Sequence, residues 1–338
     1  MDNFNLEQNG IIINLRGLDA VTFNSDLTEV TLQGGALIGD VINAAYANNA
    51  QVLTGNCNCI GTLGAGLGGG YGNLLGLHGF SVDNILSMRV VIANGSLITV
   101  TPAQEDLFWA LRGAAPNFGI VTSAVMKSYP VPQNESTAWF GGLFFTGDQV
   151  EAVVEAIENL VLESKMNIFL YFLTTGAPSF TPVVLVTPFY YGSAADGQAA
   201  FASILALGPF MDTTASTPYN EWNAAADGFC IDGGRKPSYT AGLMEMVPAT
   251  WRAIWNEWIA FLENPNTSNS LVLLEAYSLQ FAQSIPASSS SFDNRDIRFN
   301  AAVIPWYNDS SLDTVAQTFG SNVRDLWRAT SMLPQNRT

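Results

Sequence analysis

The residues of this chain whose types and spacing could do chemistry are concentrated in one glycine-rich stretch. Residues 61–72 hold seven glycines in twelve positions. Glycine at this density lets the backbone approach a flat or phosphorylated ligand closely and point N–H groups at its oxygens. The stretch alone also fits a loop that only packs against the rest of the protein, and both interpretations stay open at this point.

A dinucleotide site of the Rossmann type is one candidate for this stretch. Gly64, Gly66 and Gly69 satisfy the G-x-G-x-x-G pattern. That pattern is meaningful only when it opens a helix and when an acidic residue follows about 20 positions later. Gly72, Gly76 and Gly79 interrupt the residues that follow, and no acidic residue stands about 20 positions after Gly69. The pattern therefore does not predict a Rossmann site.

Cysteine and histidine chemistry is limited to four residues. The sequence has three cysteines and a single histidine, His78. Cys57 and Cys59 lie too close in sequence for an easy mutual disulfide, and Cys230 leaves an odd thiol. A zinc site draws several His or Cys ligands at short spacing, so no metal site is expected. A Ser-His-Asp triad could use only His78, which has no nucleophile elbow near it.

Composition excludes several functional classes. Of the 338 residues, 48% are hydrophobic and 12% are charged, which rules out intrinsic disorder because ample apolar surface can be buried. The formal net charge of −16 argues against partners that select clustered positive charge, such as nucleic acid or an anionic membrane surface. No apolar run reaches the roughly 18 residues that a membrane span needs. We therefore expect no nucleic acid and no membrane among its partners.

Hydrophobic patterning predicts the elements that must position these residues. In the first part we expect strands at 11–15, 29–32, 89–93, 96–100 and 119–126, and helices at 37–46 and 106–112. Asn94-Gly95 between two apolar strands predicts a tight hairpin turn. Near Val131 the sequence pattern changes from short strands with tight turns to strands with helices between them. A capping box from Thr146 to Gln149 then starts an amphipathic helix over 150–161. Strands at 167–173, 182–190 and 271–281 and helices at 193–207 and 251–262 complete an α+β pattern.

The order of motifs along the chain resembles a known family. After the glycine-rich stretch come Gly76–Phe80, Val82–Asn84, Asn94–Gly95, Asp106–Gly113 and Asn117–Thr122, and Ser291–Arg295 follows much later. This set resembles the FAD-linked oxidoreductases of the vanillyl-alcohol oxidase and berberine-bridge-enzyme-like superfamily. The likeness is closest to fungal members that resemble hexose and 6-hydroxynicotine oxidases.

The resemblance implies a fold class and a domain organisation. It implies an α+β chain with a PCMH-type FAD-binding domain over residues 1–130. A substrate domain over 131–310 would follow, with an antiparallel sheet covered by helices. Residues 311–338 would begin a segment that returns to the FAD-binding domain.

The resemblance also implies the residues of a cofactor site for FAD. Those it places along the flavin, ribityl chain, pyrophosphate and adenine are Gly61, Thr62, Leu63, Gly64, Gly69, Tyr71, His78, Asp83, Gly119, Ile120 and Val121. Asp83 and Asn84 would support the glycine loop. For His78 a solvent-facing loop position is favoured over a flavin contact.

The implied reaction is hydride transfer from a substrate C–H to flavin N5, with O2 as the acceptor that reoxidises the flavin. Some relatives carry a catalytic carboxylate near Gln283, but an amide has no useful basicity near neutral pH. On an expected strand from Glu275 to Gln283, alternation puts Glu275 and Tyr277 on one face. Tyr277 and Tyr171, with Gln283 at the family's position, are therefore the catalytic candidates.

Departures from the family pattern define the alternatives. The chain starts after the family's histidine-bearing phosphate loop and ends before its closing flavin-contacting segment, so a chain truncated at both ends is expected. The flavin-linking cysteine of bicovalent members aligns with Gly61, and Cys59 is two residues away with a small packed role favoured. FAD is thus expected to be bound noncovalently and weakly. The alternatives are a flavin-free relative that uses the substrate cavity for binding or a non-redox step, and an incomplete gene model without activity.

The sequence bounds the substrate and the compartment only loosely. Low charge and an aromatic set of 20 Phe, 10 Tyr and 8 Trp favour an apolar or aromatic secondary-metabolite intermediate as the small-molecule substrate. A sugar remains possible through aromatic stacking. Five N-x-[ST] sequons are compatible with secretion, although no signal peptide is visible after Met1.

Overall fold

A computed structural model describes residues 10–331 of the chain. Its first large sheet has five antiparallel strands in the order β1-β2-β6-β4-β5. The strands are β1 (Val21–Phe23), β2 (Glu29–Gln33), β6 (Ile120–Lys127), β4 (Ile85–Val91) and β5 (Leu97–Val100). The expected hairpin is confirmed, because β4 pairs with β5 and Gly95 takes a positive φ of 83° in the turn.

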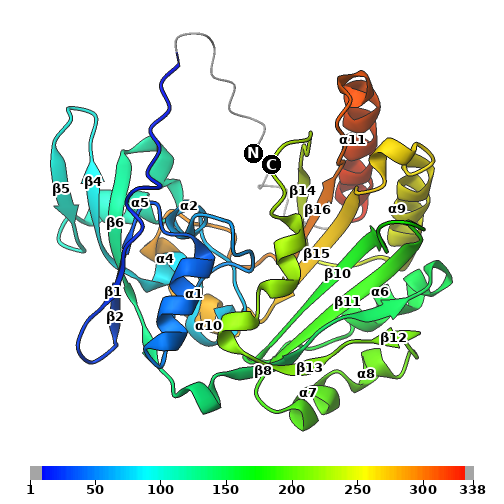
Figure 1. The fold of residues 1–338 in the computed structure, drawn as a ribbon, viewed down its shortest axis with the longest axis horizontal. Coiled ribbons are helices and arrows are strands. Elements are labelled where there is room, and N and C mark those ends of the chain that lie inside the picture. The colour runs from blue at the N-terminus through cyan, green and yellow to red at the C-terminus, as the bar shows by residue number, and fades with distance from the viewer. Residues whose placement is uncertain (1–9, 332–338) are drawn as a thin grey trace.

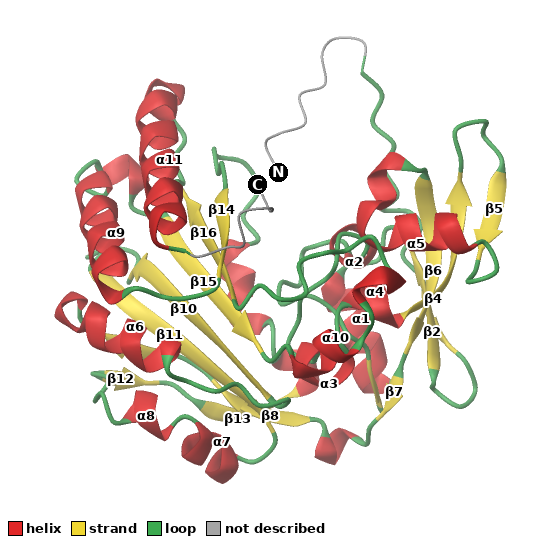
Figure 2. Cartoon of the chain, turned by 180° about the vertical axis from the view of Figure 1, so that it is seen from behind, coloured by secondary structure: helices red, strands yellow, loops and turns green. Residues whose placement is uncertain are grey.

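Helices and short segments lie on the side of this first sheet that is turned toward the second sheet (Figures 1 and 2). The longer helices are α1 (Ile38–Ala47) and α5 (Glu105–Ala114), close to the predicted ranges. A two-stranded sheet joins β3 (Ala50–Gln51) to β7 (Tyr129–Pro130). The short helix α2 (Thr62–Gly66) lies within the glycine-rich stretch, and two further short helices, α3 (Leu75–His78) and α4 (Ser81–Asn84), follow the stretch.

The second sheet has nine antiparallel strands. Its main path is β12 (Met211–Asp212), β9 (Leu143–Phe145), β11 (Pro182–Tyr191), β10 (Met166–Thr174), β15 (Leu271–Tyr277), β16 (Phe299–Ile304) and β14 (Tyr239–Leu243). Off this path, β8 (Thr137–Phe140) pairs with β11 and with β13 (Ala215–Pro218).

Helices cover one face of the nine-stranded sheet, as Figures 1 and 2 both show. They are α6 (Val150–Glu158), α9 (Pro248–Phe261) and α11 (Asp313–Thr330). The capping box at Thr146 and Gln149 precedes α6 as the sequence predicts. Val272, Leu274 and Ala276 belong to the buried core beneath these helices. Because side chains alternate along a strand, their neighbours on β15 point to the opposite face, which is where the site lies.

Three expectations about elements are wrong. Residues 11–15 form no strand, and Ile11 to Ile13 are exposed. A run of apolar residues was therefore not sufficient to form an edge strand here. The alanine-rich helix is broken at Phe201 into α7 (Ala194–Ala200) and α8 (Ala202–Leu205), since the buried Phe201 leaves helical geometry. The long strand through residue 281 ends at Tyr277, and α10 (Gln280–Ser284) follows it.

The mixed architecture agrees with the expected α+β class. The chain passes from the first sheet to the second between β7 and β8, and α11 packs against β14, β16 and α9. The division into domains at 130 and 310 stays a prediction. Among the described residues no helix is both long and apolar enough to cross a membrane.

Candidate functional site

The start of the glycine-rich run presents a face without side chains. Gly61 is the N-cap of α2, Gly64 lies in its first turn and Gly68 follows one turn later. A Cβ added at Gly61 or Gly64 would meet nothing within 4 Å, and one at Gly68 would meet only the Ala65 carbonyl oxygen at 3.7 Å. Residues at this spacing share one side of a helical turn. The result is an open strip of bare backbone.

The residues between these glycines anchor the strip. Leu63 is buried in the core of the first sheet, and the Thr62 N–H donates to the Ala36 carbonyl at 2.9 Å. The Thr62 hydroxyl is buried but has no hydrogen-bond partner among the described residues. A buried polar atom of this kind needs a partner, which a bound ligand could supply. The open glycine strip and this hydroxyl together fit a flat, polar cofactor such as FAD.

The second half of the run, taken as residues 69–72 after the open strip within residues 61–68, packs closely against other parts of the protein. A Cβ at Gly69 would lie 2.4 Å from the Phe292 ring, and one at Gly72 would lie 1.8 Å from the Thr54 carbonyl oxygen. Gly69 also has a positive φ of 122°. The N–H of Val82 in α4 donates to the Gly69 carbonyl at 3.1 Å. Here glycine permits close packing, because a side chain at Gly69 would clash with the Phe292 ring.

Tyr71 extends from the run toward the second sheet. Its ring centroid lies 5.0 Å from that of Phe80, 5.5 Å from that of Tyr277 and 6.2 Å from that of Phe292. Burial raises the pKa of Tyr71 to about 12, although a hydrogen bond to Asn300 partly opposes this. Tyr71 is therefore a neutral phenol that joins the glycine run to the face of β15.

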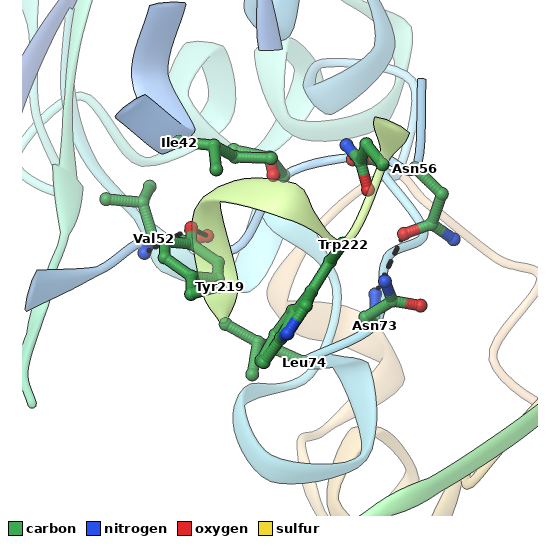
Figure 3. A pocket seen from close by; sticks show the side chains of 10 residues that line it. Ile42, Val52, Asn56, Asn73, Leu74, Tyr219 and Trp222 are labelled. Carbon is green, nitrogen blue, oxygen red and sulfur yellow. Dashed lines mark hydrogen bonds between the residues drawn. The ribbon is translucent and has the colours of Figure 1, made fainter. Parts of the chain in front are cut away.

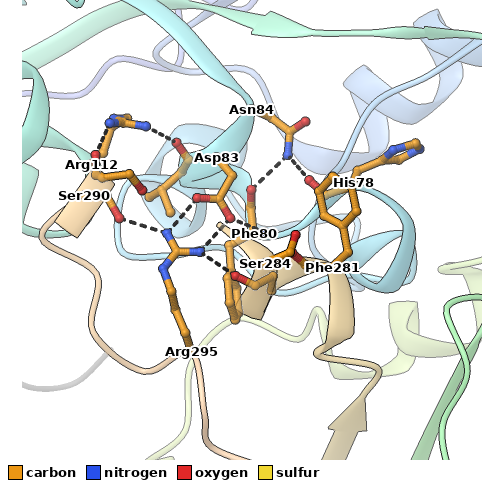
Figure 4. A network of polar contacts seen from close by, with 12 residues as sticks. His78, Phe80, Asp83, Asn84, Arg112, Phe281, Ser284, Ser290 and Arg295 are labelled. Atoms are coloured by element: carbon orange, nitrogen blue, oxygen red, sulfur yellow. Dashed lines mark hydrogen bonds and ion pairs between the residues drawn. The ribbon is translucent and has the colours of Figure 1, made fainter. Parts of the chain in front are cut away.

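Asp83 and Asn84 hold the helices that follow the run. Asp83 forms a buried ion pair with Arg295, with the Arg295 Nη2 at 2.6 Å from Oδ1 and Nη1 at 2.9 Å from Oδ2 (Figure 4). The second oxygen also accepts the Phe80 N–H at 2.9 Å. Asn84 donates to the carbonyls of His78 and Phe80. Both side chains thus fix the backbone at His78 and Phe80, beside the run, and a role of Asp83 at the cofactor stays a prediction.

His78 ends α3 and is half-buried, unlike the solvent-facing loop residue that was favoured from the sequence. Its ring stacks on Tyr129 with centroids 3.5 Å apart, and the Tyr129 hydroxyl donates to Asn84. Burial, with a contribution from Lys127, lowers the pKa of His78 to about 4. His78 is therefore neutral near pH 7, and its contact with a flavin stays a prediction.

The predicted adenine-end residues lie where β6 begins. Gly119 has a φ of 158°, and a Cβ there would meet Val90 and the Val91 carbonyl at 2.7 Å. Ile120 pairs with Val91 in the first sheet, and Val121 is buried in its core. The structure thus uses these residues to form the start of β6, and their contact with adenine stays a prediction.

The face of the second sheet opposite the helices contains a cavity. It has a volume of about 420 Å³. Its lining comprises Thr240, Ala241, Gly242, Leu273, Glu275, Asn294, Ile297, Asn300, Ala301 and Ala302. Most of these side chains are small or apolar, and Glu275 is the one carboxylate among them. A ligand here would find a largely apolar wall with one acidic group.

Glu275 is linked to the glycine-rich run by a chain of hydrogen bonds. The Tyr277 hydroxyl donates to Glu275 Oε2 at 2.7 Å, and Asn56 Nδ2 donates to the Tyr277 hydroxyl at 2.9 Å. Asn56 Oδ1 in turn accepts the Asn73 N–H at 3.1 Å (Figure 3). A second cavity of about 10 Å³, room for one water, adjoins Asn56 and Asn73. Residues before and after the run are thereby tied to the carboxylate.

Burial governs the protonation of this pair. It raises the pKa of Glu275, and the hydrogen bond from Tyr277 offsets part of that rise. Burial, with repulsion from Glu275, raises the pKa of Tyr277 well above its usual value. A carboxylate with a raised pKa beside a neutral phenol is suited to accept a proton near neutral pH.

The structure brings together two of the three catalytic candidates. Tyr171 lies on β10 opposite Leu273, and Phe169 beside it is paired with Glu275. Burial is also the main cause that raises the pKa of Tyr171. Gln283 instead lies exposed on α10, because the strand ends before it. Glu275 was placed on the Tyr277 face but not chosen as a site residue, and the available signal was a carboxylate within an otherwise apolar strand.

The cysteines correct one expectation. Cys59 forms a disulfide with Cys230, with Cα atoms 5.9 Å apart, so it is not merely a small packed residue. The partners are 171 residues apart in sequence, and their pairing depends on the folded contact between two distant loops. Cys57 keeps a free thiol. The three sulfurs are close enough to hold a metal ion, but two of them are bonded to each other and carry no thiolate charge.

Comparisons with known proteins place this architecture in a class. The FAD binding domain family matches residues 2–101. A xylooligosaccharide oxidase from Myceliophthora thermophila, solved with xylobiose, superposes with a TM-score of 0.78 at 21% identity over 93% of this chain and 69% of its own. A 6-hydroxy-D-nicotine oxidase from Arthrobacter nicotinovorans gives a TM-score of 0.80 at 20% identity over 97% and 72%. These two likenesses show that the fold is that of the PCMH-type flavoprotein oxidases.

The sequence identity to a curated relative is higher than the identity to these two solved structures. The FAD-linked oxidoreductase hasG of Aspergillus fumigatus is 32% identical over 332 residues, which cover 94% of this chain and 70% of that protein. The chain belongs to the family of FAD-linked oxidoreductases.

Proposed function

We propose that this protein oxidises a small, largely apolar molecule with FAD as its cofactor, and that Glu275 with Tyr277 removes the substrate proton. The observation that carries the proposal is the hydrogen-bonded pair of the half-buried Glu275 and the buried Tyr277 at the wall of the 420 Å³ cavity. The hydrogen bonds through Asn56 and Asn73 connect that pair to the glycine-rich run.

FAD, when bound, supplies the acceptor for a hydride from a substrate C–H. The bare strip at Gly61, Gly64 and Gly68 would hold it, and Thr62 would offer its unpartnered hydroxyl. The Tyr277 O–H holds one oxygen of Glu275, so the other carboxylate oxygen accepts the proton from a substrate hydroxyl or amine. Tyr171 and Phe169 form part of the same apolar face and exclude water from the carboxylate.

The cavity lining favours an apolar or aromatic substrate with one polar group. Ala241, Leu273, Ile297 and Ala301 offer contact area without hydrogen bonds. Asn294 and Asn300 could orient a hydroxyl or carbonyl, while a sugar would need many more polar partners. The relatives include both an oxidase solved with a disaccharide and an oxidase of 6-hydroxy-D-nicotine, so substrate screening should include both classes. O2 is the proposed electron acceptor.

The test is the substitution Glu275→Gln in the flavin-loaded chain. We expect kcat to fall by about 100-fold or more, because a positioned base contributes that much to a proton transfer. In the unaltered protein, kcat should rise with pH as Glu275 loses its proton, with a midpoint above the usual range of a glutamate. Glu275→Gln should remove that pH dependence. Glu257→Gln, at an exposed position on α9, is the matched control.

An unchanged kcat in Glu275→Gln, with the flavin spectrum intact, would exclude Glu275 as the base. A purified chain that shows no flavin spectrum and no flavin uptake would instead support the flavin-free alternative.

We further propose that the flavin is held without a covalent bond to this chain. Cys59 is engaged in the disulfide, and the neutral His78 ring is stacked on Tyr129. Acid precipitation should therefore leave a colourless pellet, and flavin in the washed pellet would contradict the proposal. Weak retention stays a prediction, which loss of flavin on prolonged dialysis would support.

We propose that the protein passes through the secretory pathway. The disulfide favours an oxidising environment. Four sequon asparagines, Asn94, Asn134, Asn266 and Asn308, lie exposed, and Asn336 falls outside the described residues. Expression in a fungal host followed by endoglycosidase treatment should lower the apparent mass. An unchanged mass with all product inside the cell would contradict this proposal.

A further inference from the structure

Three sulfur atoms meet where the glycine-rich run begins. Cys57 Sγ lies 3.5 Å from Cys59 Sγ and 3.8 Å from Cys230 Sγ. Cys59 and Cys230 are joined, and Cys57 is the free thiol. A thiol at these distances is in van der Waals contact with both sulfurs of the disulfide, beside the S–S bond, so the Cys57 side chain must turn toward the S–S axis before it can attack. We infer that the cluster is an intramolecular thiol–disulfide exchange site, with Cys57 as its nucleophile.

The exchange needs no external oxidant or reductant. The Cys57 thiolate attacks Cys230 Sγ, so a Cys57–Cys230 bond forms and the Cys59–Cys230 bond breaks. Cys59 leaves as a thiolate and takes up the proton that Cys57 lost. One disulfide and one thiol are present before and after, so the electrons balance.

Chain geometry decides which sulfur is attacked productively. Cys59 Sγ is the nearer one, but it belongs to a residue only two positions away from Cys57. A bridge between residues so close in sequence must strain the intervening backbone. Attack on Cys230 avoids that strain and keeps the two loops cross-linked. The cross-link then moves by two residues, from Cys59 to Cys57, along the loop that contains both.

Groups around the thiol set its rate. Burial raises the pKa of Cys57, Asp227 adds to that rise, and the backbone N–H of Cys59 opposes it. The Tyr171 hydroxyl also lies within electrostatic range of Cys57. Asp227 also accepts a hydrogen bond from Asn58 at 2.9 Å, so it ties the two loops together beside the sulfurs. The thiolate is therefore scarce at neutral pH, and exchange should be slow there and faster in mild alkali.

The position of the cross-link matters because of its neighbours. Cys57 follows Asn56, whose side chain donates to the Tyr277 hydroxyl and accepts the Asn73 N–H. Cys230 follows Phe229, whose ring stacks over Tyr171 with centroids 6.4 Å apart. A bond from Cys230 to Cys57 would pull on Asn56, whereas the bond to Cys59 leaves it free to hold Tyr277. The exchange therefore regulates the pair assigned to catalysis, a step that rests on the proposed function.

The exchange is tested by mapping linkages in the full chain. Protein purified at pH 6 without reductant is moved to pH 8, quenched in acid at intervals, alkylated with N-ethylmaleimide and analysed by mass spectrometry of its peptides. We expect the fraction with Cys57–Cys230 linked and Cys59 alkylated to rise from below a tenth to a third or more. The rate should not depend on protein concentration. If Cys57 alone is alkylated at every time, the inference is overturned.

Cys57→Ser serves as the matched control, since it can hold only the Cys59–Cys230 bond. Any alkylation of Cys59 in that variant would reveal exchange between molecules and overturn the intramolecular step. The mapping does not involve flavin or turnover, so its outcome is independent of whether Glu275→Gln slows the reaction.

The effect on Asn56 has its own readout. Cys59→Ser permits only the Cys57–Cys230 bond. Hydrogen–deuterium exchange can then follow the Asn73 backbone N–H, which donates a hydrogen bond to Asn56 Oδ1. Compared with Cys57→Ser, we expect the peptide that contains this amide to exchange at least tenfold faster, with circular dichroism confirming that both variants are folded. Equal exchange in the two variants would overturn the regulatory step while leaving the linkage result as it stands.

Discussion

In the first half of the glycine-rich run, Gly61 and Gly64 face open space, whereas in the second half Gly69 and Gly72 face atoms of the protein itself. The two halves look alike in sequence, yet a side chain added to the first would reach into space that a ligand can use. One added to the second would collide with Phe292 or with the Thr54 carbonyl. The comparison separates glycines that serve binding from glycines that serve packing.

The second half is also clamped from outside the run. Helix α4 donates N–H groups to the carbonyls of Gly69 and Gly70, and the Asp83–Arg295 ion pair joins α4 to the loop that carries Phe292. The side chains of Arg295 and Asp83 are only 6% and 3% exposed. Within residues 10–331, no side chain covers the open face at Gly61 and Gly64, and this face could therefore receive a cofactor.

The largest effect should come from removing the clamp. Arg295→Met leaves Asp83 buried without its partner, and breaking a buried pair in this way costs about 4 kcal/mol of unfolding free energy. Urea unfolding at pH 7 measures the loss. The double variant Arg295→Met with Asp83→Asn should recover most of it, because no unpaired charge remains. A loss below about 1 kcal/mol in the single variant would show that the pair does not hold the second half.

Gly72→Ala should have the next largest effect. The added Cβ would lie 1.8 Å from the Thr54 carbonyl oxygen, and backbone on both sides must move to relieve the clash. We expect about 3 kcal/mol of destabilisation, at the upper end for overpacking a buried site. Thermal unfolding followed by circular dichroism gives the measurement. If Gly72→Ala is as stable as the unaltered protein, the distinction between the two halves is wrong.

Gly69→Ala should be intermediate, because the Phe292 ring can turn aside where a carbonyl cannot. The positive φ of 122° and the ring contact at 2.4 Å together suggest a loss of about 2 kcal/mol. A double-mutant cycle with Phe292→Ala isolates the contact. We expect the two substitutions to be coupled by about 1 kcal/mol, since the smaller side chain relieves the clash. Additive losses would mean that backbone strain alone is responsible.

Much of the fold could be predicted from the sequence, and the site only in part. The hairpin at Asn94-Gly95 and the helix after Thr146 carry local signals, so they were predicted close to their observed bounds. The Cys59–Cys230 bond and the filling of Gly69 by Phe292 depend on contacts between distant segments, which no local pattern encodes. Glu275 was visible as a carboxylate on the Tyr277 face, but only the folded sheet shows that this face lines a cavity.

The smallest effect on stability should belong to Gly64→Ala, and it should come with the largest effect on the cofactor. Gly64 lies in α2 with nothing within 4 Å of an added Cβ, so the unfolding free energy of the apoprotein should stay equal or rise by about 0.5–1 kcal/mol, as alanine favours a helix over glycine. If the bare strip holds FAD, the new methyl group occupies part of the cofactor's place, and flavin affinity should fall at least tenfold. Titration of the apoprotein with FAD, followed by flavin fluorescence, measures that affinity. Ala65→Ser, which alters a neighbouring side chain of the same helix, is the matched control and should bind FAD normally. Unchanged affinity in Gly64→Ala, with its helix intact, would move the cofactor away from the first half of the run and remove the functional side of the comparison.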